Sequence, residues 1–430
     1  MPSEQPVAPW PAPVAAAPVD ATVTLPGSKS ATNRALVLAA LANGPSHLRA
    51  PLRSRDTALM AAALSALGTR IAEGDGDLLV MPRGLTGPAT VDVGNAGTVM
   101  RFVPPVAALA AGPVRFDGDP RARERPIGPL LAALRALGAQ VDDDGRGALP
   151  LTVNGGGAVA GGAVTLDSSG SSQLVSGLLL SGPRFEKGVE VRHSGPPVPS
   201  QPHLAMTVAA LREFGAEVDD DMPDVWRVSP GPLTGHELTI EPDLSNAAPF
   251  CAAALVTGGR VTIAGWPRQT TQPGSELPEL LTTMGAACEL TGEGLTVRGG
   301  ASIRGIEANL RDVPELTTTI AVLAALADSP STITGVAHTR LQETDRLAAL
   351  ARELTALGGD ITELPDGLEI RPRPLTGGVF ATYDDHRLAT AAALLGLAVP
   401  GVAVENVATT GKTMPGFTDL WDHMLAGRPT

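Results

Sequence analysis

The chain repeats one unit of about 70 residues six times, and this repeat limits the folds open to it more than any other feature. Five segments end a Leu- and Ala-rich helix with a similar phrase and then enter a strand. They read ALGTRI, ALGAQV, EFGAEV, TMGAAC and ALGGDI and start at residues 66, 136, 213, 283 and 356. A glycine directly after such a helix favours a left-handed C-terminal cap.

Each unit opens with a short polar cluster at the start of a helix. The clusters lie near Ser30, Asn95, Ser171, Ser245, Glu315 and Asp385, in steps of 65, 76, 74, 70 and 70 residues. A second polar loop follows each opening after 26 to 31 residues and precedes a second helix. These loops lie at Asp56, Arg125, Ser200, Glu276, Glu343 and Lys412. Ordinary alternating α/β sequence is the alternative, but the paired spacing and the shared closing phrase favour a repeat. We expect the sixth copy to be cut short after Trp421.

Length and composition exclude several classes of protein. A chain of 430 residues suggests two or three domains. The hydrophobic fraction of 43% is globular, and an aromatic fraction of 3% leaves few rings on which single-stranded nucleic acid could stack. The net charge of −13 also repels a phosphate backbone. We therefore expect no nucleic-acid partner, although a local cluster of Arg and Lys can still bind a small anion.

Cysteine usage and hydropathy restrict the chain further. Cys251 and Cys288 are too few for a disulfide framework or a thiolate zinc site, and both are expected to be buried reduced thiols in helices. No apolar run reaches the roughly 18–20 residues that span a bilayer. Residues up to about Val19 are rich in Pro and Ala and lack the features of a secretion signal. We expect a flexible leader there, and a cytoplasmic protein.

The helix openings predict an anion-binding site. Helix N-termini carry unpaired N–H groups and about half a positive charge. If related units assemble with their opening ends facing one place, several such ends converge on it. Taken singly the clusters are weak: GSKS lacks the glycine spacing of a phosphate loop, ETDR could be a cap with an ion pair, and DDHR could be a solvated helix start. The prediction depends on their joint placement.

Eight strings resemble, in order and spacing, the motifs of the shikimate-pathway enolpyruvyl transferases, the 5-enolpyruvylshikimate-3-phosphate synthase family. They are LPGSKSATNRALVLAALA, GNAGTVMRF, RERPIG, SSGSSQ, PSQPH, QETDRLAAL, DDHRLA and GKTMPGF, and they run from Leu25 to Phe417. The resemblance implies an α/β (α+β) fold, a two-domain inside-out α/β barrel built from six βαβαββ-type units. One globe would hold residues 28–242. The other would hold the leader and first strand, residues 1–27, and residues 243–430, with the active site in the cleft between the globes.

The resemblance also implies a reaction. The family transfers the enolpyruvyl group of phosphoenolpyruvate to the 5-hydroxyl of shikimate 3-phosphate and releases phosphate through a tetrahedral intermediate. Glu315 would accept the proton of the attacking hydroxyl, and Lys29 would donate to or stabilise the enolpyruvyl carbon. Glu343 and His386 would be secondary candidates for proton transfer. No metal and no bound cofactor are implied.

The binding residues follow from the same motifs. Those expected to bind shikimate 3-phosphate are Lys29, Ser30, Arg34, Ser171, Ser172, Gln173, Ser200, Glu315, His338 and Gln342. Those expected to bind phosphoenolpyruvate are Lys29, Asn95, Gly97, Arg125, Arg346, Arg387 and Lys412. The chain departs from the family pattern where Glu315 replaces a frequent Asp, Gln342 a frequent Lys, and His203 a frequent Tyr. These changes bear on substrate affinity more than on the type of reaction.

Two alternatives remain at this point. The sister enzyme that acts on UDP-N-acetylglucosamine shares the fold, but it usually carries a reactive cysteine on the loop of its second unit, and here residues 117–127 have none. A non-catalytic repeat protein would not need Glu315 and Lys29 at matching openings. We expect a monomer that binds small molecules, and we expect glyphosate to compete with phosphoenolpyruvate because Gly97 leaves room for it.

Overall fold

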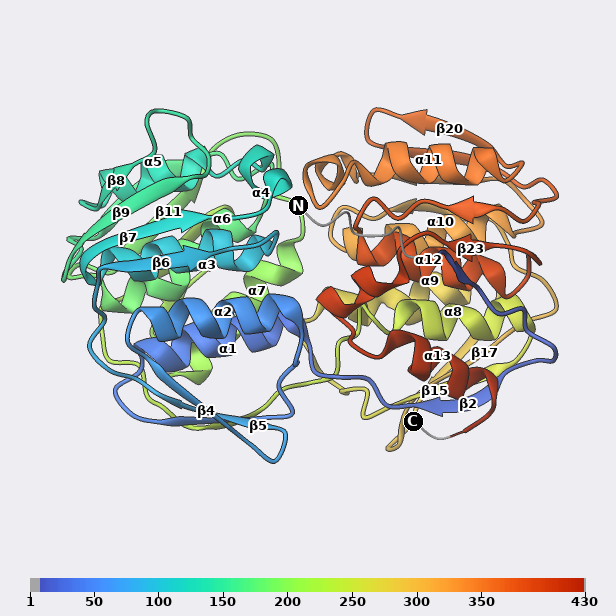
Figure 1. Ribbon diagram of the computed structural model, residues 1–430, viewed down its shortest axis with the longest axis horizontal. Coiled ribbons are helices and arrows are strands. Elements are labelled where there is room, and N and C mark those ends of the chain that lie inside the picture. The colour runs from blue at the N-terminus through green and yellow to red at the C-terminus, as the bar shows by residue number, and fades with distance from the viewer. Residues whose placement is uncertain (1–7, 429–430) are drawn as a thin grey trace. The chain divides into compact units, whose positions relative to one another are not determined.

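The computed structural model describes residues 8–428, which form two compact units. We call residues 26–241 the N-terminal unit, and residues 242–428 with the described residues up to Leu25 the C-terminal unit. Figure 1 colours the first from blue to green and most of the second from yellow to red. Within residues 8–428, every helix is too short or too polar to cross a lipid bilayer.

The N-terminal unit alternates helices with short strands. Its helices are α1 (Lys29–Leu41), α2 (Arg55–Ala66), α3 (Gly97–Ala108), α4 (Pro120–Glu124), α5 (Gly128–Ala136), α6 (Gln173–Ser181), η1 (Gly182–Arg184) and α7 (Gln201–Glu213). Its strands are β3 (Ser46–Arg49), β4 (Arg70–Gly74), β5 (Asp77–Met81), β6 (Ala89–Asp92), β7 (Ala111–Asp117), β8 (Gln140–Asp142), β9 (Leu151–Gly156), β10 (Gly162–Leu166), β11 (Val189–His193), β12 (Val218–Asp219), β13 (Val225–Val228) and β14 (Glu237–Thr239).

The C-terminal unit follows the same plan. Its helices are α8 (Ala248–Thr257), η2 (Pro273–Glu276), α9 (Leu277–Thr283), η3 (Pro314–Leu316), α10 (Thr317–Ala325), η4 (Ala337–Leu341), α11 (Arg346–Ala356), α12 (His386–Gly396), η5 (Val407–Lys412) and α13 (Phe417–Leu425). Its strands are β1 (Trp10–Pro11), β2 (Asp20–Val23), β15 (Arg260–Ala264), β16 (Ala287–Leu290), β17 (Gly294–Arg298), β18 (Glu307–Asn309), β19 (Ser331–Thr334), β20 (Asp360–Leu364), β21 (Gly367–Arg371), β22 (Val379–Phe380) and β23 (Ala403–Val404).

The repeated unit is a βαβαββ motif around one four-stranded sheet. In the second copy, β6 pairs in parallel with β7, and β9 pairs antiparallel with both β7 and β8, giving the order β6-β7-β9-β8. Val114 and Phe116 of β7 lie opposite Val153 and Leu151 of β9, and all four side chains are buried. Every second residue of a strand thus faces the helices, and the residues between point away from them, as expected for a sheet with one buried face. The sheets β10-β11-β13-β12 and β18-β19-β21-β20 repeat this order.

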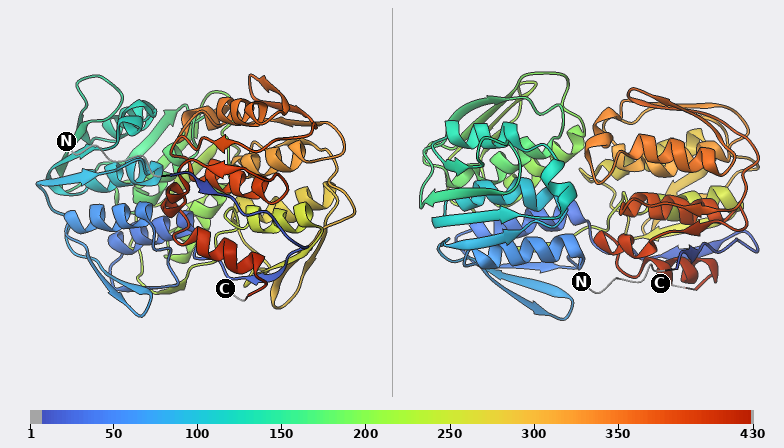
Figure 2. Two further views of the ribbon diagram at one scale, coloured as in Figure 1. Left: turned by 45° about the vertical axis from the view of Figure 1, so that its right-hand side comes forward. Right: turned by 45° about the horizontal axis from the view of Figure 1, so that its top comes forward.

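Three sheets take a strand from a distant part of the chain. The opening strand of the first copy is β14, which runs parallel to β3, and that of the fourth copy is β2, which runs parallel to β15. Figure 1 shows the blue strand β2 beside β15, and in both views of Figure 2 the blue segment stays against yellow and red elements. In the sixth copy β1 pairs antiparallel with β23. The flexible leader predicted up to about Val19 is therefore wrong for residues 10–19, where Ala12 and Val19 are buried; residues 1–7 lie outside the described residues.

The closing phrases form one recurrent cap. Gly68, Gly138, Gly215, Gly285 and Gly358 all have positive φ, between 86° and 110°. In every case the residue after the glycine donates its N–H to the carbonyl five residues back, as in Thr69 to Leu64 and Ala216 to Leu211. This is a Schellman cap, which requires a left-handed residue and so favours glycine.

The sixth copy ends in the same way, which the sequence reading missed. Gly427 has φ 64°, and Arg428 donates to the carbonyl of His423. Helix α13 therefore ends in the same cap as the other copies. The sixth copy is cut short after this helix, and β1 pairs with β23 in place of its later strands.

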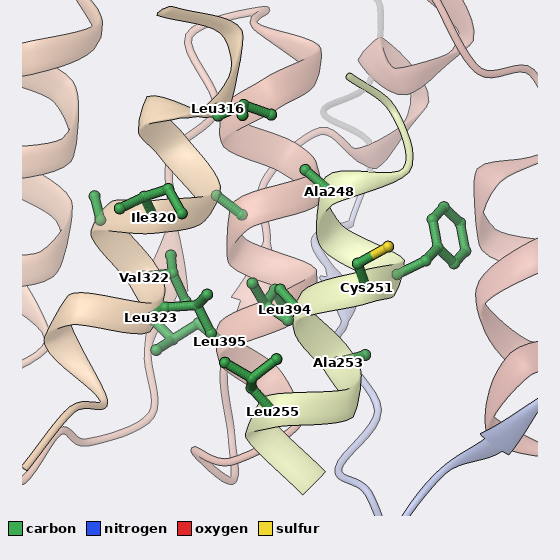
Figure 3. Close-up of a cluster of buried hydrophobic side chains, with 14 of the residues drawn as sticks. Ala248, Cys251, Ala253, Leu255, Leu316, Ile320, Val322, Leu323, Leu394 and Leu395 are labelled. Carbon is green, nitrogen blue, oxygen red and sulfur yellow. The ribbon is translucent and has the colours of Figure 1, made fainter. Parts of the chain in front are cut away.

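One helix of each copy is buried on every side. These inner helices are α1, α3 and α6 in the N-terminal unit and α8, α10 and α12 in the C-terminal unit. All residues of α3 and α10 are buried, including Arg101 of α3 and the threonines that open α10, so these helices are buried all round rather than along one stripe. Figure 3 shows Leu255, Leu323 and Leu394 clustered where α8, α10 and α12 meet. The small side chains of the sequence allow this close packing.

The two cysteines differ in burial. Cys251 is buried in α8, and burial raises the pKa of its thiol. Cys288 lies on strand β16 and is only half-buried, so the prediction of a buried helical thiol is wrong for this residue. Its position in a strand follows the glycine cap at Gly285, which ends the helix before the cysteine is reached.

Candidate active site

Most of the site residues predicted from the sequence lie at the opening of a helix or in its first two turns, whereas Arg125, Gln342 and Lys412 lie at the C-terminal end of a short helix. In the N-terminal unit they are Lys29, Ser30 and Arg34 of α1, Asn95 and Gly97 at α3, Arg125 after α4, Ser171, Ser172 and Gln173 at α6, and Ser200 at α7. In the C-terminal unit they are Glu315 of η3, His338 of η4, Gln342 and Glu343 after η4, Arg346 of α11, His386 and Arg387 of α12, and Lys412 of η5. Unpaired N–H groups and the positive helix ends accompany these side chains.

Lys29 opens helix α1 beside a buried carboxylate. The hydroxyl of Ser28 caps the helix by accepting a hydrogen bond from the N–H of Ala31. The Lys29 ammonium lies 3.4 Å from Oδ2 of Asp56, which belongs to the first turn of α2 and is 2% exposed. This ion pair fixes the lysine at the helix opening. Asp56 was identified from its spacing but not as a site residue.

Arg34 is a buried residue whose guanidinium joins helices α1 and α7. Its Nε donates to Oγ1 of Thr207 at 2.8 Å, its Nη1 to the carbonyl of Ser30 at 3.0 Å and its Nη2 to the carbonyl of His203 at 2.9 Å. Burial lowers its pKa to about 9. Three of the five N–H donors of this guanidinium are thus committed to α1 and α7, and at most two remain for a ligand.

Gly97 lies in a ring of polar groups at the opening of α3. A Cβ atom at this position would lie 2.6 Å from Nη2 of Arg125, 2.9 Å from Nη1 of Arg101 and 3.0 Å from Oε1 of Gln173. Arg125 donates through Nη1 to both the carbonyl and Oδ1 of Asn95, at 2.9 and 3.0 Å. Arg101 donates to Gln173 at 3.1 Å, which joins α3 to α6. Two guanidinium groups therefore share the space that the missing side chain leaves.

The serines lie at the openings of α6 and α7. Ser171 accepts a hydrogen bond from the N–H of Gln173, and Ser172 precedes the first residue of α6 and is buried. Ser200 precedes α7 with φ 57° and ψ 47°, a left-handed conformation that is uncommon outside glycine. Thr207 donates to Ser176, which joins α7 to α6. The four openings of the N-terminal unit are thus connected through side-chain hydrogen bonds.

Arg346 is the centre of the C-terminal cluster. Its guanidinium donates through Nε and Nη2 to the two oxygens of Asp385, at 2.7 and 3.3 Å, and through Nη2 to Glu343 at 3.0 Å. Nη1 donates to Oε1 of Gln342. Burial lowers the pKa of Arg346, but Asp385 and Glu343 outweigh this effect, so its pKa lies above the usual value. The bidentate pair joins the first residue of α11 to the cap of α12.

Three further residues extend this cluster. Lys412 donates to the second oxygen of Glu343 at 2.7 Å, so one carboxylate joins two cations. Arg387 donates to the carbonyl of Glu315 at 3.2 Å, which joins α12 to η3. Burial lowers the pKa of Arg387, and the charge of Arg346 lowers it further, against Glu315 and Asp243. A bound anion would stabilise the charged form of a cation that is buried and close to another cation in this way.

The two histidines have different surroundings. Burial lowers the pKa of His338 to about 4, partly offset by the charge of Glu315, so its ring is neutral at pH 7. His386 is buried, with Nδ1 3.8 Å from Oδ1 of Asp385. Neither ring lies in a group of residues that could hold a metal ion within residues 8–428.

Three groups that the sequence placed in the repeated clusters, but that were not assigned to the site, hold the predicted residues in place. Arg101 and Asp56 lie beside Gly97 and Lys29, and Asp385 accepts from Arg346 and from the N–H of Arg387. Each lies inside a motif that was recognised: GNAGTVMRF, the second polar loop and DDHR. Each is a charged residue near the start of a helix. The sequence does not show whether such a helix start is buried or exposed to solvent.

This arrangement can be compared with known proteins. The family model for EPSP synthase (3-phosphoshikimate 1-carboxyvinyltransferase) matches residues 14–421. The chain belongs to the EPSP synthase family. A solved structure of EPSP synthase from Acinetobacter baumannii is 26% identical over 98% of both chains with a TM-score of 0.79. A second structure of EPSP synthase from the same organism is 25% identical over 97% of both chains with a TM-score of 0.78.

Membership of the EPSP synthase family confirms the resemblance, the fold class and the activity predicted from the sequence. The activity is that of a 3-phosphoshikimate 1-carboxyvinyltransferase of the shikimate pathway, which serves aromatic biosynthesis. The substrates are the small molecules shikimate 3-phosphate and phosphoenolpyruvate. The UDP-N-acetylglucosamine enzyme and a non-catalytic binding protein are therefore set aside.

Proposed function

We propose that the helix-opening residues of the two units bind the substrates of the EPSP synthase reaction and transfer its protons. The observation that carries this proposal is the clustering of cations at these openings. Arg101 and Arg125 meet at Gly97. In the C-terminal unit, Arg346 and Lys412 donate to buried carboxylates, and Arg387 donates to the carbonyl of Glu315. Both substrates are anions that carry one phosphate and one carboxylate each, so a reaction between them needs several fixed cations.

Shikimate 3-phosphate is assigned to the N-terminal openings. The hydroxyls of Ser171, Ser172 and Ser200 and the N–H groups of α6 and α7 would hold its phosphate. Ser30 and Arg34 would bind its carboxylate. The guanidinium of Arg34 already donates a hydrogen bond to the carbonyl of Ser30, which fixes the backbone there. Gln173 would pack against the ring. In the C-terminal unit, His338 and Gln342 are assigned to the same substrate. His338 is neutral, and Gln342 is bonded to Arg346, so neither adds a positive charge.

Phosphoenolpyruvate is assigned to the guanidinium groups. Arg125, Arg346 and Arg387, with Lys412 and Lys29, would bind its phosphate and carboxylate, and the backbone of residues 95–97 would approach it closely. Arginine suits this role because its planar fork donates to two oxygens at once. The hydrogen bonds that now join these cations to Asn95, Glu343 and Asp385 keep them oriented before the substrate binds.

The proton transfers are assigned to carboxylate and ammonium groups. Glu315 would take the proton of the 5-hydroxyl as its oxygen attacks C2 of phosphoenolpyruvate, while Lys29 would donate a proton to C3 or stabilise the enolpyruvyl carbon. The tetrahedral intermediate then breaks its bond to phosphate and loses a proton from C3. Glu343, which is bonded to Lys412 and Arg346, and His386 are secondary candidates for that second transfer.

The test is a phosphate-release assay with the Glu315→Gln variant. Wild-type protein should release phosphate only when both substrates are present. The variant should lose about 100-fold or more in kcat, the usual size of a lost general base, and should still bind shikimate 3-phosphate in calorimetry. A near-normal kcat would show that another group is the base. Release of phosphate with UDP-N-acetylglucosamine in place of shikimate 3-phosphate would contradict the substrate assignment.

Three further properties belong to the proposal. Glyphosate would compete with phosphoenolpyruvate, because the space beside Gly97 is bordered by two guanidinium groups that suit an anion. Inhibition that phosphoenolpyruvate does not relieve would contradict this. The enzyme would act in the cytoplasm, because both substrates are charged phosphate esters that do not cross membranes. It would be a monomer, which light scattering tests against the chain mass of 43.8 kDa.

A further inference from the structure

The turn before helix α12 has an unusual backbone. Tyr383 and Asp384 both adopt left-handed conformations, with φ 50° and 55°, directly before Asp385 caps the helix. Among the described non-glycine residues with positive φ, these two alone are adjacent in sequence. Asp tolerates this region, but a bulky aromatic residue there is an outlier that the surrounding structure must hold in place.

The second copy has a glycine at the corresponding position. Gly94 lies two residues before the cap of α3 as Tyr383 lies two residues before the cap of α12, and its φ is also 50°. Glycine adopts this conformation at no steric cost. The C-terminal unit has tyrosine at the position where glycine would fit best, so the side chain itself must contribute something.

The Tyr383 side chain is bonded to helix α11. Its hydroxyl donates to Oε1 of Glu353 at 2.6 Å, and the other oxygen of Glu353 accepts the N–H of Ala381 at 2.9 Å. Glu353 is buried, with 7% exposed. The guanidinium of Arg352 also lies over the tyrosine ring and 3.3 Å from its hydroxyl. One carboxylate of α11 therefore holds both the Tyr383 side chain and the backbone of Ala381, two residues earlier.

The same turn is bonded on its other side to η5. The carbonyl of Asp384 accepts from Oγ1 of Thr409 at 2.8 Å, and Oδ1 of Asp384 accepts from Nδ2 of Asn406 at 3.1 Å. Helix η5 ends at Lys412. The turn thus links α11, which begins with Arg346, η5, which ends with Lys412, and α12, whose second residue is Arg387.

We infer that Tyr383 is a positioning residue, whose bond to Glu353 holds the turn that aims Arg387 and Lys412 at phosphoenolpyruvate. This inference rests on the proposed roles of these two cations. A glycine at position 383 would relieve the backbone but would remove the side-chain hydrogen bond from the turn to Glu353. The bond from Arg346 to Asp385 joins the first residue of α11 to this turn, and the bond from Tyr383 to Glu353 joins the turn to α11 two helical turns further along α11.

The experiment compares Tyr383→Phe and Glu353→Gln with the wild type in steady-state kinetics. Each variant should lower kcat/KM for phosphoenolpyruvate by about tenfold, which corresponds to one hydrogen bond to a charged group, with KM for shikimate 3-phosphate within about twofold. Tyr383→Phe removes the donor of this hydrogen bond, and Glu353→Gln removes the charge of its acceptor. Because both changes act on one bond, the loss in the double variant should be well below the product of the two single losses. A merely structural role would reduce the active fraction and leave both KM values unchanged. That outcome, or additive losses, would overturn the inference.

Two controls separate this inference from the proposed function. Asp75→Gly changes another left-handed residue, in the β4–β5 turn of the other unit, and should leave both KM values unchanged. Arg387→Lys should raise KM for phosphoenolpyruvate. A normal KM in Arg387→Lys would reject the proposed role of the cation, whereas a defect there with normal Tyr383→Phe kinetics would reject the positioning role alone.

A spectroscopic readout covers the case in which a variant folds poorly. Tyr383 is the only tyrosine of the chain, so protein labelled with 3-fluorotyrosine has a single fluorine signal at this site. That signal should shift when phosphoenolpyruvate binds in the presence of shikimate 3-phosphate, because the turn responds to the cations it positions. A signal that both substrates leave unchanged would contradict the inference.

Discussion

Replacing Gly97 with alanine tests the geometry of the proposed phosphoenolpyruvate site directly. The new Cβ would lie 2.6 Å from Nη2 of Arg125, whereas ordinary contact begins at 3.4 Å. The guanidinium must therefore retreat by about 0.8 Å, the difference between these two distances. Arg101 must also shift, since its Nη1 would lie 2.9 Å away. Both atoms are the far ends of flexible side chains, so the cost to folding should be small and the cost to ligand binding large.

The size of the effect follows from the bond that is displaced. A hydrogen bond to a charged group contributes about 1.5–3 kcal/mol, so losing the bond from Arg125 should raise KM for phosphoenolpyruvate by about 10- to 150-fold. KM for shikimate 3-phosphate should change much less. Initial rates across a grid of both substrates measure this, and thermal unfolding checks that the fold is intact.

The matched control is Gly74→Ala. Gly74 ends strand β4, and a Cβ there would meet no atom within 4 Å. This variant should behave as the wild type in both kinetics and unfolding. A Gly97→Ala enzyme whose KM for phosphoenolpyruvate stays within about twofold, far below the loss of one charged hydrogen bond, would refute the assignment of Arg125 to that substrate.

Three other predictions follow from described contacts. The folded-state pKa of His338 is depressed to about 4 from 6.5, so protonation opposes folding, and stability should fall as the pH drops from about 6.5 to 4. His338→Asn should show a shallower fall in unfolding midpoint over that range, and an equal fall would contradict it. Burial and the bond to Glu353 raise the pKa of Tyr383, so tyrosinate absorbance should appear at lower pH in Glu353→Gln than in wild type; an unchanged titration would mean that the bond does not form. Gly215→Ala, at a φ of 86°, should lower stability by about 1–2 kcal/mol in denaturant unfolding, whereas Gly231→Ala, which meets no atom within 4 Å, should not.

Some parts of the structure could be predicted from the sequence because they depend on local backbone chemistry. The closing glycines predicted helix ends, and five of them form the same Schellman cap, since a left-handed residue after a helix is a local requirement. The same reading overlooked Gly427, because LAGR does not repeat the preceding phrase closely. Cys288 was placed in a helix from its composition, although the cap at Gly285 had already ended that helix.

Other parts depend on contacts between distant segments. The leader was expected to be flexible, yet β1 pairs with β23 and β2 with β15, across more than 200 residues. Strand pairing of this kind leaves no local pattern, because a short strand needs only an alternating face. Arg34 was predicted as a ligand from its motif, and the structure commits most of its donors to Thr207, Ser30 and His203.

The sequence by itself determined the six-fold repeat, the positions of the helix openings and the kind of residue at each. These are set by caps, periodicity and side-chain chemistry, which act over a few residues. Only the tertiary structure decided which openings share contacts, that Asp385 and Glu343 orient Arg346, and that a tyrosine occupies the strained turn before α12. Those outcomes depend on burial and on long-range hydrogen bonds, and their strength is fixed by neighbours that lie far away along the chain.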